Sequence, residues 1–496
     1  DVRVLERLPA PRPWAPALAI HARTMEALRG LGVADDLISR GLTKVDLEVH
    51  VGDSVVSGTL GDLELPTTEY PFVFFAPQIE VEASLRERLA SLGVNVEWAS
   101  TFRSFRTIDD EVVCRFDVRG QESLIHARYL AGCDGADSVV RRESGTAFRG
   151  RSYRESVVIA DIDAAVALKD STAHAFIGTN GILFLFPLPS GRWRLIGPGS
   201  GTATPETVTT MVETHARREI DVSAVDRFEV VRLQHRLADR YRRGRVFLAG
   251  DAAHVHSPAG AQGMNTGIQD AVNLGWKLAL VLKGAPESLL DTYDRERRRV
   301  AKQVVLWTGL AFALEVSKLA PFRWGRRWMA LPAARLLLTR RRLVSVFGRV
   351  ASGLDTSYRE GALEVAGRLG RCRPGRRLPD HLIRAGETSR VHHLITADRF
   401  HLLTFDEAVD VTRVRDLADA YGDLLRWHHV GSIEHEFAVS WALVRPDGYI
   451  AAANRGADLE AAERYLLKWL GTPGVFGHVG IAEKSHASDR GSGRRP

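Results

Sequence analysis

Hydrophobic and polar positions follow different periods in successive parts of the chain, and these periods predict strands or helices. Between residues 150 and 235 the period is two, and strands are expected at 174–177, 182–188 and 193–196. Residues 45–75 contain similar short strand-like runs. Residues 45–75 and 151–235 are therefore predicted to form one antiparallel sheet in a domain of its own.

On either side of this sheet, short apolar strands are followed by helical periodicity. Helices are expected at 17–32, from Gln78 onward and at 268–282. Residues 289–297 carry charges that are typical of a solvated helix face. The alternation predicts an α/β domain assembled from 1–44, 76–150 and 236–300.

The last third of the chain begins with a helical region at 301–365 and then returns to strands. Strands are expected at 400–405, 439–444 and 449–452, with a hairpin turn at 445–448 and a helix at 459–470. We therefore expect a C-terminal domain over 370–482. Residues 483–496 are polar and glycine-rich, which predicts a disordered tail.

Composition narrows the class of protein. A chain of 496 residues is too long for one core, so two to four domains are expected. The net charge of +6 comes mainly from arginine and accompanies no nucleic-acid-binding motif. Apolar and basic bands at 324–328 and 336–338 resemble a membrane-surface helix, but packing across domains is the commoner explanation.

Cysteine usage and hydropathy bear on the compartment. The three cysteines, Cys114, Cys133 and Cys372, have neither metal-ligand nor disulfide-framework spacing. The sequence contains no apolar run of about 18 residues and no signal pattern at its start. We expect a cytoplasmic protein without membrane insertion.

The stretch from 244 to 271 holds the strongest chemical signal. An apolar run at 245–249 is closed by Gly250 and Asp251, and a glycine-rich segment at 260–267 precedes the helix. A carboxylate at a strand end can accept hydrogen bonds from sugar-like hydroxyls, and a helix N-terminus offers free N–H groups to an anion. The segment suits a ligand that is part polyol and part anion.

Two further segments end a strand in an acid. Residues 1–5 read as a strand that ends at Glu6, and a dinucleotide-binding unit places such an acid about 20 residues after a G-x-G-x-x-G loop. No such loop occurs in the chain, so either the chain is truncated or the natural protein lacks its first βα element. Residues 132–141 read as a strand, the turn Asp134-Gly135 and a helix.

In this order, the segments resemble the class A FAD-dependent aromatic hydroxylases, which are para-hydroxybenzoate hydroxylase-like flavoprotein monooxygenases. Residues 132–141 match the family's DG motif, 244–271 match its second FAD motif, and Gln78 matches a flavin-contacting glutamine. The C-terminal part resembles the thioredoxin-like domain of phenol and polyketide hydroxylases. It lacks a C-x-x-C motif, which leaves an architectural or homodimerising role.

The resemblance implies a Rossmann-like FAD-binding domain that is incomplete at its N-terminus, an antiparallel substrate domain and a thioredoxin-like domain. The family's pyrophosphate arginine is replaced by Pro16, with only Arg12 or Arg23 nearby. The cofactor-binding residues implied are Glu6, Arg23, Gln78, Asp134, Gly135, Gly250, Asp251, Pro258, Gly260, Gln262, Gly263, Met264 and Asn265.

The implied reaction is hydroxylation of a phenolic or polycyclic, polyketide-like aromatic compound. It would use NADPH or NADH, O2 and a flavin C4a-hydroperoxide. Phe184, Phe186 and Trp193 are candidates for an aromatic substrate pocket. No general base is singled out, and His254 and His256 are interpreted as structural rather than metal-binding.

Two other functions stay open. One is a non-catalytic relative that lost FAD and acts as a binding or dimerising protein. The other is a flavin enzyme of the same fold that performs epoxidation or Baeyer-Villiger insertion.

Overall fold

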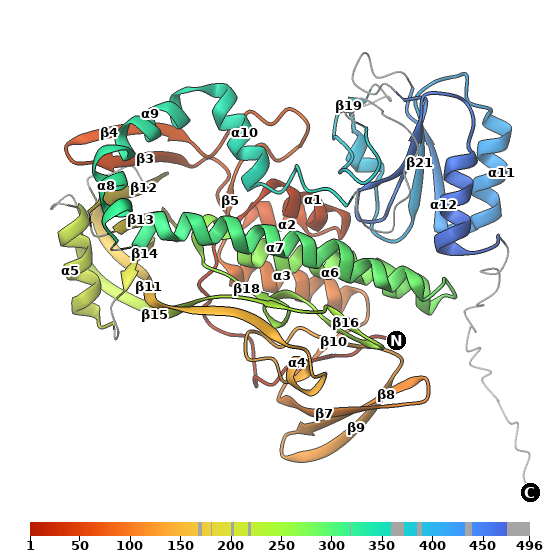
Figure 1. Cartoon of the computed structure of the whole chain (residues 1–496), viewed down its shortest axis with the longest axis horizontal. Coiled ribbons are helices and arrows are strands. Elements are labelled where there is room, and N and C mark those ends of the chain that lie inside the picture. The colour runs from red at the N-terminus through yellow and green to blue at the C-terminus, as the bar shows by residue number, and fades with distance from the viewer. Residues whose placement is uncertain are drawn as a thin grey trace, which may run out of the picture.

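The computed structural model describes residues 1–166, 171–179, 181–199, 203–216, 220–317, 319–358, 372–383, 389–431 and 439–473. These residues form an α/β part, a large sheet with its covering helices, and a C-terminal domain (Figure 1). The α/β part, with the N-terminal half of the long helix that follows it, comprises 1–44, 74–147 and 239–300 and is called the cofactor side below. The predicted α/β fold class is confirmed.

The strands of the α/β part fall into separate groups. β1 (Val4–Leu5) pairs in parallel with β6 (Val96–Glu97), and β10 (Leu130–Gly132) pairs in parallel with β17 (Val246–Leu248). Within the described residues, no hydrogen-bonded strand joins the two pairs. The remaining strands here are β2 (Ala19–Ile20), β5 (Phe74–Phe75), β7 (Ser100–Ile108), β8 (Glu111–Val118), β9 (Gln121–Ala127) and β16 (Arg242–Arg243).

Helices pack beside these strands. They are α1 (Ala22–Gly30), α2 (Ala34–Ser39), α3 (Gln78–Ser91), α4 (Val139–Glu143) and α6 (Gln262–Leu282). Two predicted boundaries move: the helix expected from residue 17 starts at Ala22, after a short strand, and the helix expected from 268 starts at Gln262. At neither Ala22 nor Gln262 does the hydrophobic pattern of the sequence mark the start of a helix.

The predicted antiparallel domain is an eight-stranded sheet in the order β18-β15-β11-β14-β13-β12-β3-β4. Among the described strands of this sheet, only β3 and β12 pair in parallel, an arrangement that is possible because no short turn joins them. The strands are β3 (Asp46–Val51), β4 (Ser54–Thr59), β11 (Phe148–Val166), β12 (Thr172–Gly178), β13 (Gly181–Pro187), β14 (Trp193–Gly199), β15 (Ile220–Ala238) and β18 (His254–Val255).

Different helices cover the two faces of this sheet. Leu183, Leu185 and Trp193 share a core with α5 (Pro205–Ala216), whereas Phe184 packs near α9 (Ala330–Thr339). Because side chains alternate along a strand, Phe184 and Phe186 project to the face opposite Leu185. The sheet therefore has a core face under α5 and a second, aromatic face.

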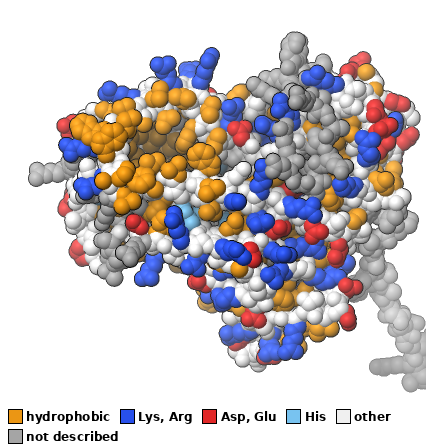
Figure 2. Space-filling model, in the orientation of Figure 1, with side chains coloured by type: hydrophobic (Ala, Val, Ile, Leu, Met, Phe, Trp, Pro, Cys, Tyr) orange, Lys and Arg blue, Asp and Glu red, His pale blue; other side chains and the backbone are white. Residues whose placement is uncertain are grey.

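A helical layer follows the sheet and exposes large apolar side chains. It consists of α7 (Ser288–Val316), α8 (Ala320–Trp328), α9 and α10 (Arg341–Ala351). In Figure 2 these apolar side chains gather around a hollow, and Lys and Arg lie at the edge. The exposed residues are Leu306, Trp307, Leu310, Leu314, Leu319, Trp324, Trp328, Met329, Leu336, Leu337, Val346, Phe347 and Val350. The prediction that the bands at 324–328 and 336–338 pack across domains is therefore wrong for Trp324, Trp328, Leu336 and Leu337, which are exposed.

Among the described helices, none is by itself long and apolar enough to span a bilayer. One bent pair, Ser288–Glu315 with Ala320–Trp328, satisfies the length and composition criteria only when its two helices are taken together.

The C-terminal domain has a mixed sheet in the order β22-β21-β23-β24, in which β21 and β22 are parallel and the other pairs antiparallel. The predicted tail at 483–496 lies outside the described residues. The elements of this domain are β19 (Leu382–Ile383), β20 (Ser389–Arg390), β21 (Phe400–Thr404), β22 (Leu425–His429), β23 (Trp441–Val444), β24 (Ile450–Asn454), α11 (Val411–Tyr421) and α12 (Glu460–Leu470).

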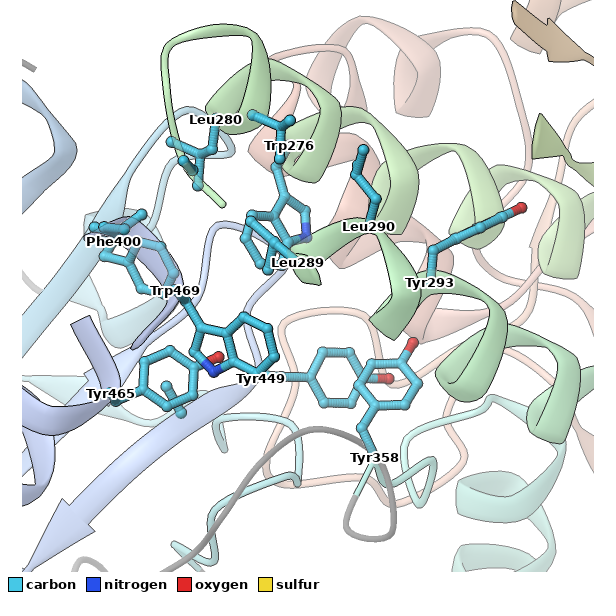
Figure 3. Packing of buried hydrophobic residues seen from close by; sticks show 14 of the residues in the cluster. Trp276, Leu280, Leu289, Leu290, Tyr293, Tyr358, Phe400, Tyr449, Tyr465 and Trp469 are labelled. Atoms are coloured by element: carbon cyan, nitrogen blue, oxygen red, sulfur yellow. The ribbon is translucent and has the colours of Figure 1, made fainter. Parts of the chain in front are cut away.

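One hydrophobic core joins this domain to α6 and α7. Figure 3 shows Trp276 and Leu289 from the helices facing Phe400, Tyr449 and Trp469 of the C-terminal domain. The Trp276 and Phe400 rings meet edge to face with centroids 5.7 Å apart. The C-terminal domain is therefore packed as part of the cofactor side of the molecule.

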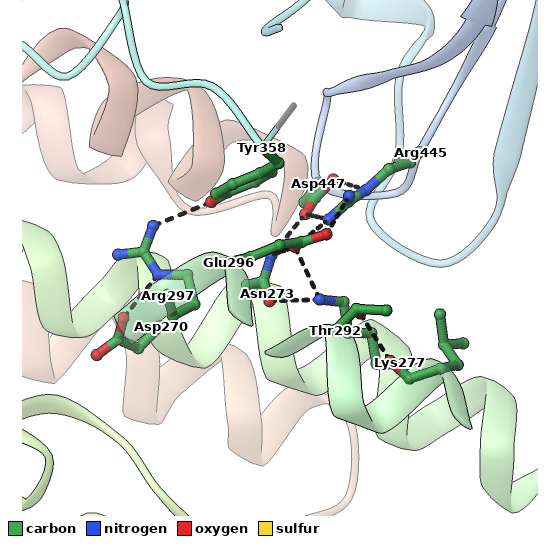
Figure 4. A network of polar contacts seen from close by, with 10 residues as sticks. Asp270, Asn273, Lys277, Thr292, Glu296, Arg297, Tyr358, Arg445 and Asp447 are labelled. Atoms are coloured by element: carbon green, nitrogen blue, oxygen red, sulfur yellow. Dashed lines mark hydrogen bonds and ion pairs between the residues drawn. The ribbon is translucent and has the colours of Figure 1, made fainter. Parts of the chain in front are cut away.

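Buried charges cross the same boundary (Figure 4). The Glu296 carboxylate of α7 accepts hydrogen bonds from Lys277 Nζ at 2.8 Å and from both terminal nitrogens of Arg445 at 2.8 and 2.9 Å. Asp447 accepts from Arg445 and from Asn273 Nδ2. All five side chains are buried.

The expectation of a solvated helix face at 289–297 holds for Asp291 and Arg295, which are exposed, but is wrong for Glu296 and Arg297. Glu296 is 2% exposed and Arg297 is 0% exposed, because their partners come from α6 and from the C-terminal domain. A sequence pattern does not show such distant counter-charges.

We predict that Glu296→Gln destabilises the protein by about 3–5 kcal/mol at pH 7, because it leaves Lys277 and Arg445 buried without their shared carboxylate. Denaturant unfolding followed by tryptophan fluorescence measures this loss. The matched control is Glu460→Gln, which breaks an exposed pair with Arg464 and should cost less than about 0.5 kcal/mol. Equal midpoints for the two variants would contradict the prediction.

The same carboxylate gives an acid-dependent stability. Burial opposes its ionisation, but Arg445 and Lys277 outweigh burial and lower the pKa of Glu296 from 4.5 to about 2. Since the folded pKa lies below the unfolded one, its contribution is complete above about pH 4.5 and is lost as the pH falls toward 2, by about 3 kcal/mol in all. Unfolding midpoints of the wild type and Glu296→Gln should therefore converge between pH 4.5 and 2.

Candidate functional site

The Gly250-Asp251 turn lies where β17 ends and meets α6 at very short range. Gly250 has a φ of +59°, in the left-handed region that favours glycine. A Cβ on Gly267 would stand 3.4 Å from the Gly250 Cα, so two glycines allow strand end and helix to touch. This is the strand, turn and helix arrangement that the sequence predicts.

Asp270 fastens the turn to α6 and α7. Its carboxylate accepts from the Gly250 N–H at 3.2 Å, from His254 Nε2 at 2.6 Å and from Arg297 Nε at 2.7 Å. Burial opposes ionisation, but Arg297 and His254 outweigh it and lower the pKa of Asp270. Arg297 also donates to the Tyr358 hydroxyl at 3.0 Å (Figure 4). Asp270 and Arg297 hold the site together, but no sequence motif singles them out, because their contacts arise only in the folded chain.

The N-terminus of α6 is left open toward any ligand. Gly260 and Ala261 both adopt positive φ, +72° and +53°, and no side chain caps the helix. Its first N–H groups have no partner within the helix, and its dipole end is positive. The predicted residues Gln262, Gly263, Met264 and Asn265 form this first turn.

Asn265 and His21 hold the open helix end in place. Asn265 Oδ1 accepts from the His21 N–H at 2.9 Å, and its Nδ2 donates to the carbonyls of Ala19 and Ala261. His21 Nε2 lies 2.9 Å from the Gly260 carbonyl, and burial lowers the pKa of the His21 imidazole. Neutral His21 therefore donates from Nε2, a role that sequence reasoning did not assign.

The other predicted residues of this loop have structural contacts. Gln262 Nε2 donates to the Ala351 carbonyl at 2.9 Å, Met264 packs against the core around Ile20, and Pro258 precedes the short turn Ala259–Ala261. Gly263 has room beside His256, whose Cε1 would lie 3.9 Å from an added Cβ.

Asp251 and Cys133 lie on the exposed side of two strand ends. Desolvation by the surrounding protein raises the pKa of Asp251 and raises that of Cys133 to about 11. The two residues come from the ends of neighbouring strands, β10 and β17, as ligand sites of parallel sheets do.

Asp134 caps α4. Its Oδ2 accepts from the N–H groups of Val139 and Val140 at 2.7 and 3.0 Å, and its Oδ1 accepts from the Ser138 hydroxyl. Gly135 takes a φ of +81°, and a Cβ there would meet no atom within 4 Å. The turn thus presents bare backbone beside Cys133, while the carboxylate is engaged within the protein.

Glu6 and Gln78 stand at the predicted element ends. Glu6 follows β1, and its Oε1 accepts from the Leu8 N–H at 2.9 Å. Gln78 begins α3, where its N–H donates to the Ala17 carbonyl and its Nε2 donates to Glu82.

The loop at Pro16 is held by an arginine that the sequence did not single out. Arg194 of β14 donates from one terminal nitrogen to the carbonyls of Ala15, Pro16 and Ala17 at 3.0 to 3.1 Å. It also forms a two-bond pair with Asp161 at 2.7 and 2.9 Å. The large sheet therefore positions this loop of the cofactor side.

Two predictions are not matched by the geometry. Arg23 is buried and contacts Glu26, the Asp447 carbonyl and the Tyr449 ring, so its guanidinium lies between α1 and the C-terminal domain. Trp193 is buried on the α5 face, whereas Phe186 stacks on Phe75 on the opposite face with centroids 5.7 Å apart. The side-chain alternation of β13 and β14 separates Trp193 from Phe184 and Phe186.

The site fits FAD on its own chemistry. An open helix N-terminus suits a diphosphate or an electron-rich ring, and a desolvated carboxylate suits hydroxyl donors. Buried ring nitrogens near this loop, His21 Nδ1 and His256 Nε2, have no hydrogen-bond partner among the described residues. Backbone, carboxylate and imidazole groups are thus available to a polar, anionic ligand.

Comparison with known proteins agrees with this geometry. Residues 1–308 match a family described as an FAD binding domain, and 371–473 match the C-terminal domain of aromatic-ring hydroxylases. A 6-methylpretetramide 4-monooxygenase of Streptomyces rimosus is 35% identical over 491 residues, covering 91% of this chain and 86% of that protein.

Two solved structures extend the likeness over nearly the whole chain. The anhydrotetracycline hydroxylase from Streptomyces rimosus is 29% identical with a TM-score of 0.76, covering 95% of this chain and 94% of that one. Aklavinone-11 hydroxylase, solved with FAD and aklavinone, is 25% identical with a TM-score of 0.77, covering 96% and 94%.

These matches confirm FAD as cofactor and the predicted aromatic monooxygenase function. The chain belongs to the family of FAD-dependent aromatic-ring hydroxylases.

Proposed function

We propose that the protein hydroxylates a polycyclic, polyketide-like phenol with NADPH or NADH and O2. The observation that carries this proposal is the stacking of Phe75, from the cofactor side, on Phe186 of the aromatic sheet face. Phe75 pairs with Ala19, whose carbonyl accepts from Asn265 at the start of α6, so this contact connects the flavin-type site to the aromatic sheet face, which suits a flat, electron-rich ring. Relatives with this architecture are named for multi-ring aromatic substrates.

The size of the apolar surroundings supports a large substrate. The aromatic face continues under α9, and the exposed apolar residues of α7 to α10 surround a hollow on the same side of the molecule (Figure 2). An entry lined by leucine, tryptophan and phenylalanine favours a compound with several fused rings over a single phenol.

Each polar group has a defined task. Glu6 would accept from the adenosine ribose, and Asp251 from the ribityl hydroxyls. The α6 N-terminus would stabilise negative charge on the reduced flavin ring, and Pro258 would shape the loop beside it. When bound, FAD supplies hydride acceptance from NAD(P)H and activation of O2. In the balanced reaction NAD(P)H, a proton, O2 and the aromatic substrate give NAD(P)⁺, water and the phenol product.

The roles of Asp134 and Gln78 rest on backbone rather than on free side chains. Their side chains are engaged with Ser138 and Glu82, so we propose that they shape the turn and the helix start that face the cofactor. A homodimer and a cytoplasmic location remain predictions from the sequence.

The decisive experiment measures flavin binding and turnover together. The chain is titrated with FAD by fluorescence quenching and then supplied with NADPH or NADH, 18O2 and a panel of polycyclic phenols. We expect faster NAD(P)H oxidation with a matching phenol and a product that carries one 18O atom. A second sample carries an added βα unit with a G-x-G-x-x-G loop.

The outcomes separate the alternatives. A ring hydroxyl supports the proposal, whereas an epoxide or an inserted ester oxygen, distinguished by NMR, would replace hydroxylation with the other oxygenations. If neither sample binds FAD, a non-catalytic protein becomes the better description. Unstimulated NAD(P)H oxidation across the whole panel, with FAD bound, would refute the proposed substrate class.

We predict that Asp251→Ala weakens FAD binding by about 10- to 100-fold, because charged hydrogen bonds contribute about 1.5–3 kcal/mol. Fluorescence titration measures the change. The control, Asp35→Asn, alters an exposed acid in the first turn of α2 and should leave affinity unchanged. Equal affinities for the wild type and Asp251→Ala would remove Asp251 from the site.

The two faces of the sheet predict different results for aromatic residues. Phe186→Ala should raise KM for a polycyclic phenol about tenfold, the effect of losing about 1.4 kcal/mol of contact, and should cost less stability than Trp193→Ala because Phe186 is only partly buried. Trp193→Ala should instead cost about 3–5 kcal/mol of stability, because it opens a cavity in the α5 core. Thermal unfolding and steady-state kinetics on both variants test the assignment, which a reversed pattern would overturn.

A further inference from the structure

Glu48, His50 and His174 form a cluster that the flavin chemistry does not use. They lie on β3 and β12, whose parallel pairing sets Glu48 directly opposite His174. His174 is opposite Leu185 on the next strand, so the cluster shares the α5 face with the Leu185 and Trp193 core. It is thus on the opposite side of the sheet from Phe184 and Phe186.

The three ligand-type atoms converge. His50 Nε2 lies 3.2 Å from His174 Nδ1, and Glu48 Oε2 lies 3.7 Å from His50 Nε2 and 3.5 Å from His174 Nδ1. A single N–H···N hydrogen bond between the two imidazole rings accounts for the 3.2 Å contact. The carboxylate oxygen stays outside normal hydrogen-bond range of both nitrogens, so hydrogen bonding alone does not explain the triangle.

A tetrahedral ion explains the spacing. With metal–ligand bonds of about 2.0–2.1 Å, the ligand atoms of a tetrahedral zinc site stand about 3.3–3.4 Å apart. The observed edges of 3.2, 3.5 and 3.7 Å bracket this value. Two imidazoles and a carboxylate are also a ligand set that zinc uses in proteins.

The surroundings order the ligands and leave one side open. The His50 ring stacks on Phe176 with centroids 4.4 Å apart, and the His174 ring lies 5.7 Å from that of Trp193. The Glu48 side chain is 25% exposed while that of His174 is fully buried, so an ion and a fourth, water ligand can enter from the Glu48 side.

We propose that Glu48, His50 and His174 bind one Zn²⁺ that ties β3 to β12. The β3–β4 hairpin reaches the large sheet from a distant part of the chain, and an ion bridging the only parallel pair of that sheet would stabilise this connection. His174 Nε2 has no hydrogen-bond partner among the described residues. Because ligating histidines usually gain affinity from such a partner, binding should be on the order of micromolar rather than tighter.

Zinc binding is tested on untagged, chelator-treated protein. Isothermal titration with ZnCl2 should give one ion per chain, and Co²⁺ should give the visible absorption of a tetrahedral site. Zinc should also raise the thermal unfolding temperature of the protein, measured without FAD or substrate.

Variants locate the site. His50→Gln, a buried ligand, and Glu48→Gln, at the open side, should weaken zinc binding by about 100-fold and about 10-fold and should abolish the thermal shift. His126→Gln, which removes an exposed histidine paired with Glu111 in another sheet, and Cys133→Ser should change neither. Absence of zinc binding by the wild type, or equal binding by wild type, His50→Gln and Glu48→Gln, would overturn the proposal.

Discussion

The charge pairs buried along α6 and α7 are the constraint on which the rest of the structure depends. Asp270 and Arg297 fix the Gly250 turn against α6, and Glu296, next to Arg297 in α7, binds Lys277 and Arg445. Buried charges tolerate little displacement, because any unpaired member keeps its full desolvation cost. The flavin-type turn, two helices and the C-terminal domain are therefore held as one unit.

The local geometry of the site follows from this unit. Asp270 fixes the middle of α6. The start of the helix is then set by the left-handed backbone at Gly260 and Ala261 and by the hydrogen bonds of Asn265 to the Ala19 and Ala261 carbonyls. The helix end stays uncapped while the surrounding protein supplies rigidity. A binding site for an anionic ring benefits from this combination, because no donor has to move when the ligand arrives.

Much of this arrangement could be predicted from the sequence, because the decisive signals are local. Three signals can each be recognised within a single segment of the sequence. They are the acid after a strand, the glycines at 260–267 and the alternation at 182–188. Arg23 and Trp193 show the limit. Their residue types suited a ligand, but Arg23 donates across a domain boundary to the Asp447 carbonyl, and Trp193 falls on the opposite face of the sheet by register. The burial of Glu296 and Arg297 could not be predicted for the same reason, since their charged partners lie 19 to 149 residues away in the sequence.

The Arg445 hairpin has a consequence for how this protein and its relatives can be recombined. Its guanidinium donates two hydrogen bonds to the buried Glu296 carboxylate of α7, although each part also keeps a charge pair of its own, Lys277 with Glu296 and Arg445 with Asp447. A chimera that exchanges the C-terminal domain at a boundary near residue 371 would lose both bonds unless the incoming hairpin brings an arginine to the same place. Inheritance of the two parts is thereby coupled through buried ion pairs that cross the boundary, Arg445 with Glu296 and Arg377 with Glu26, whose members are more than a hundred residues apart in the sequence.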